Sequence, residues 1–300
     1  MNGKKLWQWQ QQRSLNLARA SRRCSTIEAL AAALGSAALI LGSGQLPSGA
    51  ATPPSTPAPA ATTPVPPAIA ALIGQLDNAA SRKDLEATMK FYGPGFTHAD
   101  GLDFKTQQQA LKLFWQEAKS IQYQTQIDRV QAQGPNRYVL ETTTTLRGVR
   151  KSADRDMDLT ATVRSRLTLA DSKIVAQEIL SEQTRLTSGD KPPNVNITLP
   201  EQVSVGQTFS FDAVVKEPLG EDLLLGSALE EPISVERYLQ PAIITLEPLT
   251  AGGIFKTAQA PQQPTRKWIS AVLIKNGGMT IVSQRLNVVR PNGSATSTPR

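Results

Sequence analysis

The spacing of apolar residues in the first half of the chain changes from a helical period to a strand period near residue 120. Apolar residues recur every three or four positions in three early stretches, which predicts helices over about 68–80, 81–92 and 106–118. The segment Gly93-Pro94-Gly95 is expected to be a turn. From Ser120 apolar and polar residues alternate, which predicts antiparallel strands around 121–127, 138–147, 159–169 and 173–186. Because one face of this sheet is apolar, we expect the helices to cover it.

The second half shows no helical period after about residue 188. Alternating segments predict strands at 195–199, 209–215, 243–247 and 268–274, and Asn276-Gly277 is a hairpin turn that leads into a further strand at 279–289. Several strands punctuated by Gly and Pro over about a hundred residues are typical of a β-sandwich. The fold class is therefore α+β. We predict an α+β domain at 68–190, a separate all-β body at 193–290 and a disordered tail at 291–300.

The stretch Glu217–Pro232 contains three consecutive leucines between acidic pairs, and it allows two interpretations. As a strand, Leu223, Leu224 and Leu225 belong to the core. As a loop, they form an exposed apolar patch of the kind that marks a partner surface. They are therefore candidate interface residues.

The first 67 residues have the composition of a targeting signal followed by a spacer. Six basic residues precede an apolar run from Ala29 to Leu41, and small residues at 48–50 suit cleavage after Ala50. This pattern is typical of an export signal, here residues 1–50, and it predicts a periplasmic, lumenal or secreted protein. The alternative is an uncleaved segment that anchors the chain in the membrane. Residues 51–67 form a Pro- and Thr-rich linker, a composition that favours an extended spacer.

Charge and cysteine content narrow the possible partners. Six of the 32 Lys and Arg residues and one of the 25 acids lie in residues 1–51, which leaves 26 bases and 24 acids in the remainder. So balanced a surface gives no reason to expect nucleic-acid binding. Cys24 is the only cysteine and precedes the apolar run, so we expect neither a lipid anchor nor disulfides, thiolate metal sites or cysteine nucleophiles in the mature protein.

The element order resembles a known superfamily. Over about residues 68–188 the chain is similar to the nuclear transport factor 2-like (NTF2-like, or SnoaL-like) superfamily, in which three helices precede a four-strand meander. The local similarities are the pairs Phe91-Tyr92 and Phe114-Trp115 and the run Arg164-Ser165-Arg166-Leu167. Leu199–Gln207 resembles the entry to the second strand of bacterial immunoglobulin-like modules. The combination of an NTF2-like domain with an immunoglobulin-like module resembles a group of exported bacterial proteins that are usually described only by their superfamily.

The resemblance implies a cone-shaped α+β pocket, with Tyr92, Trp115, Tyr123 and Tyr138 as pocket candidates. Some members catalyse isomerisation, dehydration or cyclisation, whereas many bind a ligand or a protein without chemistry, so the fold does not fix the function. Members also dimerise through the polar face of the sheet. Arg164 and Arg166 are therefore candidates for a homodimer interface, and Glu141 or Gln177 is expected to oppose them within the chain.

The strongest catalytic candidates are His98, which is the only histidine, and Asp100. In the enzymatic branches a buried His or Asp acts as a general base. The alternative is that His98 and Asp100 lie on a solvated loop between the second and third helices. Asp154, Asp156 and Asp158 alternate like the start of a calcium loop, but Leu159 replaces the glycine that such a loop needs, so we predict a hairpin tip and no metal. No cofactor is expected.

The sequence thus favours an exported, non-catalytic protein whose cone binds a small apolar ligand or a protein, with the β-sandwich as an interaction module. Two alternatives remain open at this point. One is an isomerase- or dehydratase-like enzyme that uses His98 or Asp100. The other is a structural subunit that associates with copies of itself.

Overall fold

The computed structural model describes residues 64–152, 155–220, 222–239, 246–249 and 251–291, all of which belong to one compact unit. The predicted export signal with Ala50, almost all of the linker and residues 292–300 of the predicted tail lie outside this part of the chain. Among the described helices none is long and apolar enough to span a membrane.

Three helices form where the helical period predicts them: α2 (Pro67–Ser81), α3 (Leu85–Met89) and α4 (Phe104–Glu117). Proline at the first position of α2 costs little because its missing N–H has no partner there anyway. The Asp84 side chain caps α3. Asp103 and Thr106 form a reciprocal capping box that begins α4, and these local bonds fix where each helix starts.

The segment predicted as a turn at Gly93-Pro94-Gly95 is instead part of a strand, β1 (Tyr92–His98), which pairs in parallel with β5 (Lys173–Gly189). The register shifts between Tyr92 and Thr97, so the prolyl segment occupies an irregular stretch of the pairing where a missing N–H is tolerated. The prediction failed because a break signal in the sequence does not distinguish a turn from an irregular strand.

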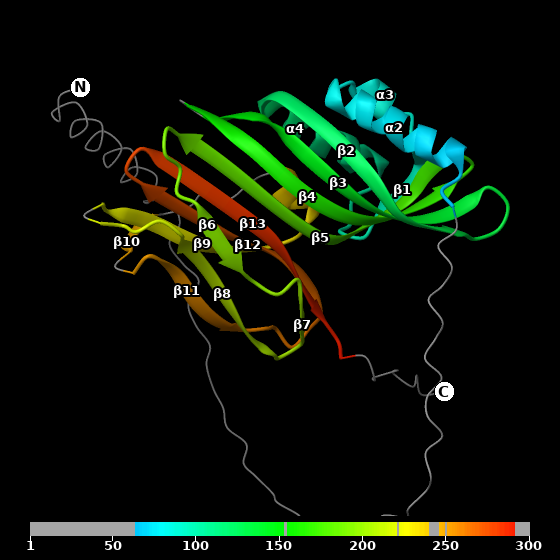
Figure 1. Cartoon of the computed structure of the whole chain (residues 1–300). Helices are drawn as coiled ribbons and strands as arrows, with labels where there is room; N and C mark the ends of the chain where they lie inside the picture. The colour runs from blue at the N-terminus through cyan, green and yellow to red at the C-terminus, as the bar shows by residue number, and fades with distance from the viewer. Residues whose placement is uncertain (1–63, 153–154, 221, 240–245, 250, 292–300) are drawn as a thin grey trace, which may run out of the picture. The chain divides into compact units, whose positions relative to one another are not determined.

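The four-strand meander is confirmed. It consists of β2 (Ala118–Ala132), β3 (Arg137–Ser152), β4 (Arg155–Ala170) and β5, each paired antiparallel with the next. Helices α2 to α4 lie over one face of these strands (Figure 1). Two buried clusters, one around Trp115 and Leu159 and one around Ile73 and Leu140, join helices to strands. The helices therefore do cover the apolar face, as expected.

The second half is built almost entirely of strands. They are β6 (Val195–Thr198), β7 (Gln202–Ser204), β8 (Thr208–Val215), β9 (Leu224–Pro232), β10 (Glu247–Leu249), β11 (Gly253–Gln259), β12 (Thr265–Lys275) and β13 (Gly278–Val289). The hairpin at Asn276-Gly277 is confirmed, since Lys275 pairs with Gly278 across it. Of the strand predicted at 243–247, only Leu246 and Glu247 fall in the described part, and β10 begins at Glu247. A short helix, α5 (Val235–Leu239), was not predicted.

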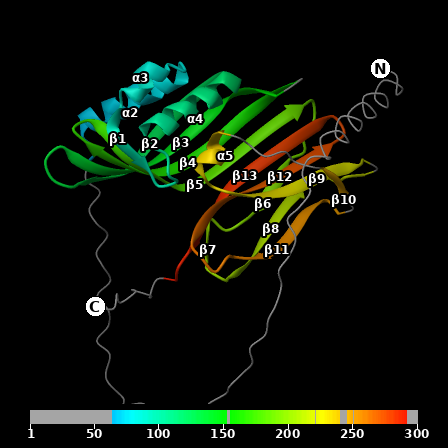
Figure 2. The same ribbon diagram turned by 180° about the vertical axis from the view of Figure 1, so that it is seen from behind.

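Two sheets enclose the core of the second half. Strands β11, β8 and β6 form a three-stranded sheet, and its inner residues pack with those of β9, β12 and β13 in one buried cluster that includes Phe211, Ala213, Leu273 and Leu286. Figure 2 shows the small sheet beside these strands from behind. The immunoglobulin-like character predicted for residues 193–290 stays a prediction.

The expectation of a separate all-β body is wrong in one respect, because the halves share a sheet. Strand β13 pairs antiparallel with β5 from Gly278↔Gly189 to Gln284↔Gln183. The result is one ten-stranded sheet with the order β10-β9-β12-β13-β5-β4-β3-β2, to which β1 and β7 add at the side. Gly189 has φ +95°, and a Cβ there would lie 2.2 Å from the carbonyl oxygen of Gly277, so close backbone approach requires glycine at this seam.

The three consecutive leucines at 223–225 differ in burial, so the core and the surface interpretation each fit part of the run. Leu224 is 1% exposed and belongs to the core, as expected for a strand, while Leu223 just before β9 is 64% exposed. Leu225 is half-buried. Only Leu223 is therefore available as an exposed apolar contact, and a single exposed leucine is ordinary for a protein surface.

Candidate binding site

A cavity of about 200 Å³ lies between the helices and the meander. Its walls come from α2, α3, α4 and strands β1 to β5, and most of its lining is apolar, including Ile73, Leu76, Leu111, Leu146, Val163 and Leu167. An apolar cavity of about 150 Å³ is large enough to take up benzene. This cone cavity can therefore hold a molecule about the size of one substituted ring.

Three aromatic side chains line the cone cavity. Tyr92, Trp115 and Tyr123, which the sequence analysis named, are all in its lining, whereas Tyr138 is not. Tyr138 packs at the edge of the neighbouring buried cluster around Leu140. Trp115 Nε1 donates to the Tyr123 hydroxyl at 2.9 Å, and their rings meet edge to face. Tyr123 therefore keeps its own O–H proton for a ligand.

Both cavity tyrosines are neutral donors at physiological pH. Burial raises the pKa of Tyr92 to about 12 and raises the pKa of Tyr123 further, because the phenolate would lose its hydration. Neither hydroxyl is thus set up to act as a base. Each is suited to donate a hydrogen bond to an acceptor on a bound molecule.

Asp77 is a cavity residue that the sequence analysis missed. Its two carboxylate oxygens accept hydrogen bonds from the backbone N–H of Thr125 at 2.6 Å and from the Thr125 hydroxyl at 2.7 Å. The available signal was its place in the helix: Asp77 follows Ile73 by four residues and so falls within the apolar stripe. A charged residue on the buried face of a helix is a reason to look for a site.

Two more missed residues present unpaired oxygens in the cavity lining. The hydroxyl of Thr88 and the amide Oε1 of Gln177 are buried and have no hydrogen-bond partner among the described residues. A buried polar atom without a partner costs about 1–3 kcal/mol. A molecule with a donor group would remove this cost, so these two atoms are candidate contacts for a polar group in the cavity.

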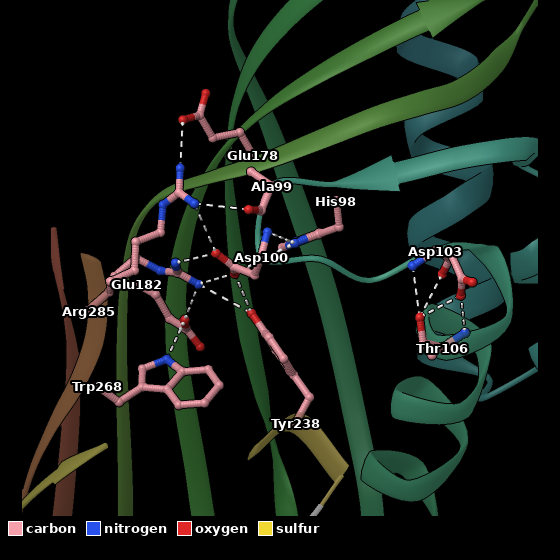
Figure 3. Close-up of polar contacts among 11 residues, drawn as sticks. His98, Ala99, Asp100, Asp103, Thr106, Glu178, Glu182, Tyr238, Trp268 and Arg285 are labelled. Atoms are coloured by element: carbon pink, nitrogen blue, oxygen red, sulfur yellow. Dashed lines mark hydrogen bonds and ion pairs between the residues drawn. The ribbon is translucent and has the colours of Figure 1, made fainter. Parts of the chain in front are cut away.

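The catalytic candidates His98 and Asp100 lie elsewhere. Neither lines the cone cavity, and neither is on a solvated loop, since their side chains are only 4% and 1% exposed. They belong to a polar cluster at the point where β1 ends and β13 leaves β5. This junction cluster comprises His98, Asp100, Glu182, Tyr238, Trp268 and Arg285 (Figure 3).

The ion pair between Asp100 and Arg285 is the centre of the junction cluster. Arg285 is fully buried and donates from two nitrogens to the two Asp100 oxygens at 3.1 and 2.8 Å. Tyr238 of α5 donates to the same carboxylate at 2.8 Å. Trp268 donates to Glu182 at 3.0 Å, and Glu182 lies 3.4 Å from Arg285. Asp100 is therefore occupied by partners from the second half.

The charge states of this cluster follow from its contacts. Burial raises the pKa of Asp100, but hydrogen bonds and charge from Arg285 outweigh it and hold the pKa below its ordinary value. Burial lowers the pKa of His98. The charge of Asp100 raises this pKa, whereas the charges of Arg285 and Arg266 lower it further. The Asp100 backbone N–H donates to His98 Nδ1 at 3.1 Å, which requires an unprotonated Nδ1. The geometry thus holds a carboxylate beside a neutral imidazole.

The predicted interface arginines have partners within the chain. Arg166 donates to Glu141 at 3.1 Å, as expected, and to Glu178 at 2.8 Å. Gln177 does not oppose them, because its side chain lines the cone cavity. Arg164 lies 4.0 Å from Glu201 in a groove of about 940 Å³ that β5 and β13 border. A homodimer through this face stays a prediction.

Comparisons with known proteins divide the chain at about the same place as the sequence pattern. A family model described as a domain of unknown function (DUF8623) matches residues 190–289. No curated protein matches the chain. The N-terminal part is similar to several solved structures of the NTF2-like kind.

One is a protein named after scytalone dehydratase from Novosphingobium aromaticivorans, at 9% identity over 37% of this chain and 80% of that one, with a TM-score of 0.31. A ketosteroid isomerase-like protein from Catenulispora acidiphila, in complex with trimethylamine, matches at 11% identity over 36% and 82%, with a TM-score of 0.26. An NTF2-like protein from Cytophaga hutchinsonii matches at 10% identity over 36% and 84%, with a TM-score of 0.21. Likenesses of this degree do not decide what this chain binds or catalyses.

The two polar sites therefore differ in chemistry. The cone cavity offers hydroxyl donors, unpaired acceptors and one carboxylate around a largely apolar cavity, which suits binding. The junction cluster is densely paired and joins segments far apart in the sequence, which suits a structural connection. Among the described residues no group of three or more His, Cys, Asp or Glu side chains is placed to hold a metal ion.

We expect Asp100→Ala to lower the free energy of unfolding by about 3–5 kcal/mol, because it leaves the buried Arg285 charge without its main partner. Asp103→Ala, three residues along the same segment, removes a helix cap and is expected to cost about 1 kcal/mol. Urea denaturation of both variants measures the difference. Equal losses would contradict a central role for the ion pair.

The free energy of unfolding should fall as the pH is lowered through the ordinary His98 pKa of 6.5. The unfolded chain binds a proton there, while folded His98 resists protonation until lower pH, so acid favours unfolding. His98 is the only histidine, and His98→Gln is therefore expected to flatten the dependence between about pH 7 and 5. Denaturation at a series of pH values tests this, and an unchanged slope in the variant would refute it.

Proposed function

We propose that the chain is an exported, non-catalytic binding protein that holds a small, largely apolar molecule in the cone cavity. The single observation that carries the proposal is the pair of unpaired oxygens, on Thr88 and Gln177, in the lining of a largely apolar cavity. Polar atoms left unpaired in a protein interior need an explanation, and a bound molecule with a donor group supplies it.

The size and lining of the cavity agree with this proposal. Binding sites for small molecules are concave and mostly apolar, with a few polar groups that orient the ligand. Here the aromatic wall of Trp115 and Tyr123 supplies area and one donor, while Thr88 and Gln177 supply acceptors on other parts of the lining. The volume of about 200 Å³ favours a molecule with one ring over a larger one.

The position of the catalytic candidates supports binding without chemistry. His98 and Asp100 are outside the cavity lining, and Asp100 is engaged by Arg285 and Tyr238. Asp77, which does line the cavity, already accepts two hydrogen bonds from Thr125. The enzyme alternative that uses His98 or Asp100 in the cone therefore lacks its named base at the site.

The second half and the N-terminus complete the proposal. Residues 193–290 are proposed to act as an immunoglobulin-like interaction module. A family model of unknown function covers nearly the same segment, which supports its treatment as one sequence unit. Export is supported by the basic head, apolar run and small residues of positions 1–50.

Filling part of the cavity should weaken binding. The full chain is expected to bind neutral one-ring probes such as cyclohexanol, and Val163→Phe, which adds a ring to the cavity wall, should weaken that binding at least about tenfold. Val149→Phe changes a half-buried valine outside the lining and serves as the control. Calorimetry and native mass spectrometry measure occupancy. Equal binding by both variants, or turnover of a bound probe, would overturn the proposal.

Export can be tested directly. When the full chain is produced in a bacterial host, we expect mature protein outside the cytoplasm that begins at Ala51, after cleavage behind Ala50. Mass spectrometry of the N-terminal peptide reads this end. An intact N-terminus in the membrane fraction would favour the anchored alternative instead.

A further inference from the structure

We infer that the cone cavity selects a small organic cation, with a protonated amine placed against Asp77. This inference rests on the proposed function and adds the charge of the ligand to it. The inference starts from the charged residues of the cavity lining. Among the described residues that line the cavity, one is acidic and none is Lys, Arg or His.

The first argument is that Asp77 lacks a counter-ion. No basic side chain lies within ion-pair distance of Asp77 among the described residues, although most other buried or half-buried carboxylates, such as Asp100, Glu182 and Glu231, have such a partner. An acidic group in a largely apolar enclosure without an opposite charge is unfavourable. A cation in the cavity would supply the missing charge.

The second argument is the remaining hydrogen-bonding capacity of Asp77. A carboxylate has about four lone-pair sites, and Thr125 uses two of them through its N–H and its hydroxyl. Thr125 also holds the carboxylate in place, because its hydroxyl lies 2.9 Å from that of Thr144 on the next strand. An ammonium group can therefore donate to Asp77 without displacing an existing bond.

The third argument is that the lining also contains an unpaired hydrogen-bond acceptor and three aromatic rings. Gln177 Oε1 can only accept hydrogen bonds and has no partner among the described residues. An ammonium group has several N–H donors, so it can donate to Gln177 as well as to Asp77. The rings of Tyr92, Trp115 and Tyr123 line the same cavity, and aromatic faces attract cations. The negative charge of Asp77 would repel an anionic ligand, and such a ligand would leave Gln177 Oε1 unpaired. The lining therefore disfavours anions.

The test on the unmodified full chain compares three probes of similar shape: protonated cyclohexylamine, cyclohexanol and cyclohexanecarboxylate. A charge-assisted hydrogen bond to Asp77 should make the amine bind roughly tenfold to a hundredfold more tightly than the alcohol. The carboxylate should bind least. Calorimetry at neutral pH, where the amine is charged, gives the three dissociation constants.

The matched variant is Asp77→Asn, which removes the charge and keeps the shape. It should reduce the preference for the amine over the alcohol to about threefold or less, within the scatter of neutral hydrogen bonds. Asp190→Asn makes the same change of net charge at an exposed position outside the cavity and should leave the preference intact. Thermal unfolding of both variants shows whether each is folded.

The outcomes separate the two proposals. If cyclohexanol binds and cyclohexylamine binds no better, the cation inference is overturned and the binding function stands. If none of the three probes binds, the proposed function itself fails. Because the probe comparison uses the unmodified chain, a variant that does not fold leaves this decision unaffected.

Discussion

The buried ion pair between Asp100 and Arg285 is the interaction on which the arrangement of the described residues depends. Strand β5 has β1 along the first part of one side and β13 along the last part of the same side. Between the end of β1 and the point where β13 departs, the sheet would be interrupted. Asp100, which follows β1, and Arg285, which follows the last β13–β5 pair, bridge this interruption. A fully buried arginine is tolerable only with such a partner, so the two halves are interdependent.

The cone cavity and the junction cluster use the same two strands for different purposes. Tyr92 at the start of β1 lines the cavity, while His98 at its end belongs to the cluster. On β5, Gln177 faces the cavity, and Glu182 five residues later contacts Arg285. Among the described residues the cluster leaves Arg285 Nε without a partner but is otherwise densely paired, whereas the cavity retains the unpaired oxygens of Thr88 and Gln177. Dense pairing suits a structural connection, and unpaired oxygens around a cavity suit the proposed binding of a ligand.

The sequence was sufficient for the elements that depend on local periodicity, and insufficient where distant segments meet. The meander and the helices over it follow from alternation and helical spacing, and Trp115 and Tyr123 could be named as pocket residues through a resemblance. Asp100 could not be paired with Arg285, since 185 positions separate them and nothing local marks either as buried. Gln177 was assigned to the polar face because a bulge in the β4–β5 pairing shifts its register. Bulges and long-range ion pairs are properties of the assembled fold.

The shared sheet also affects how the molecule avoids unwanted association. Two separate sheets would each have offered a bare strand, β5 in one and β13 in the other, and pairing them removes both. The strands that remain at the ends of the main sheet are poor templates for another chain. Strand β2 is interrupted by two irregularities, and β10 is only three residues long with Pro248 at its centre. Fusion of the halves therefore serves solubility as well as architecture.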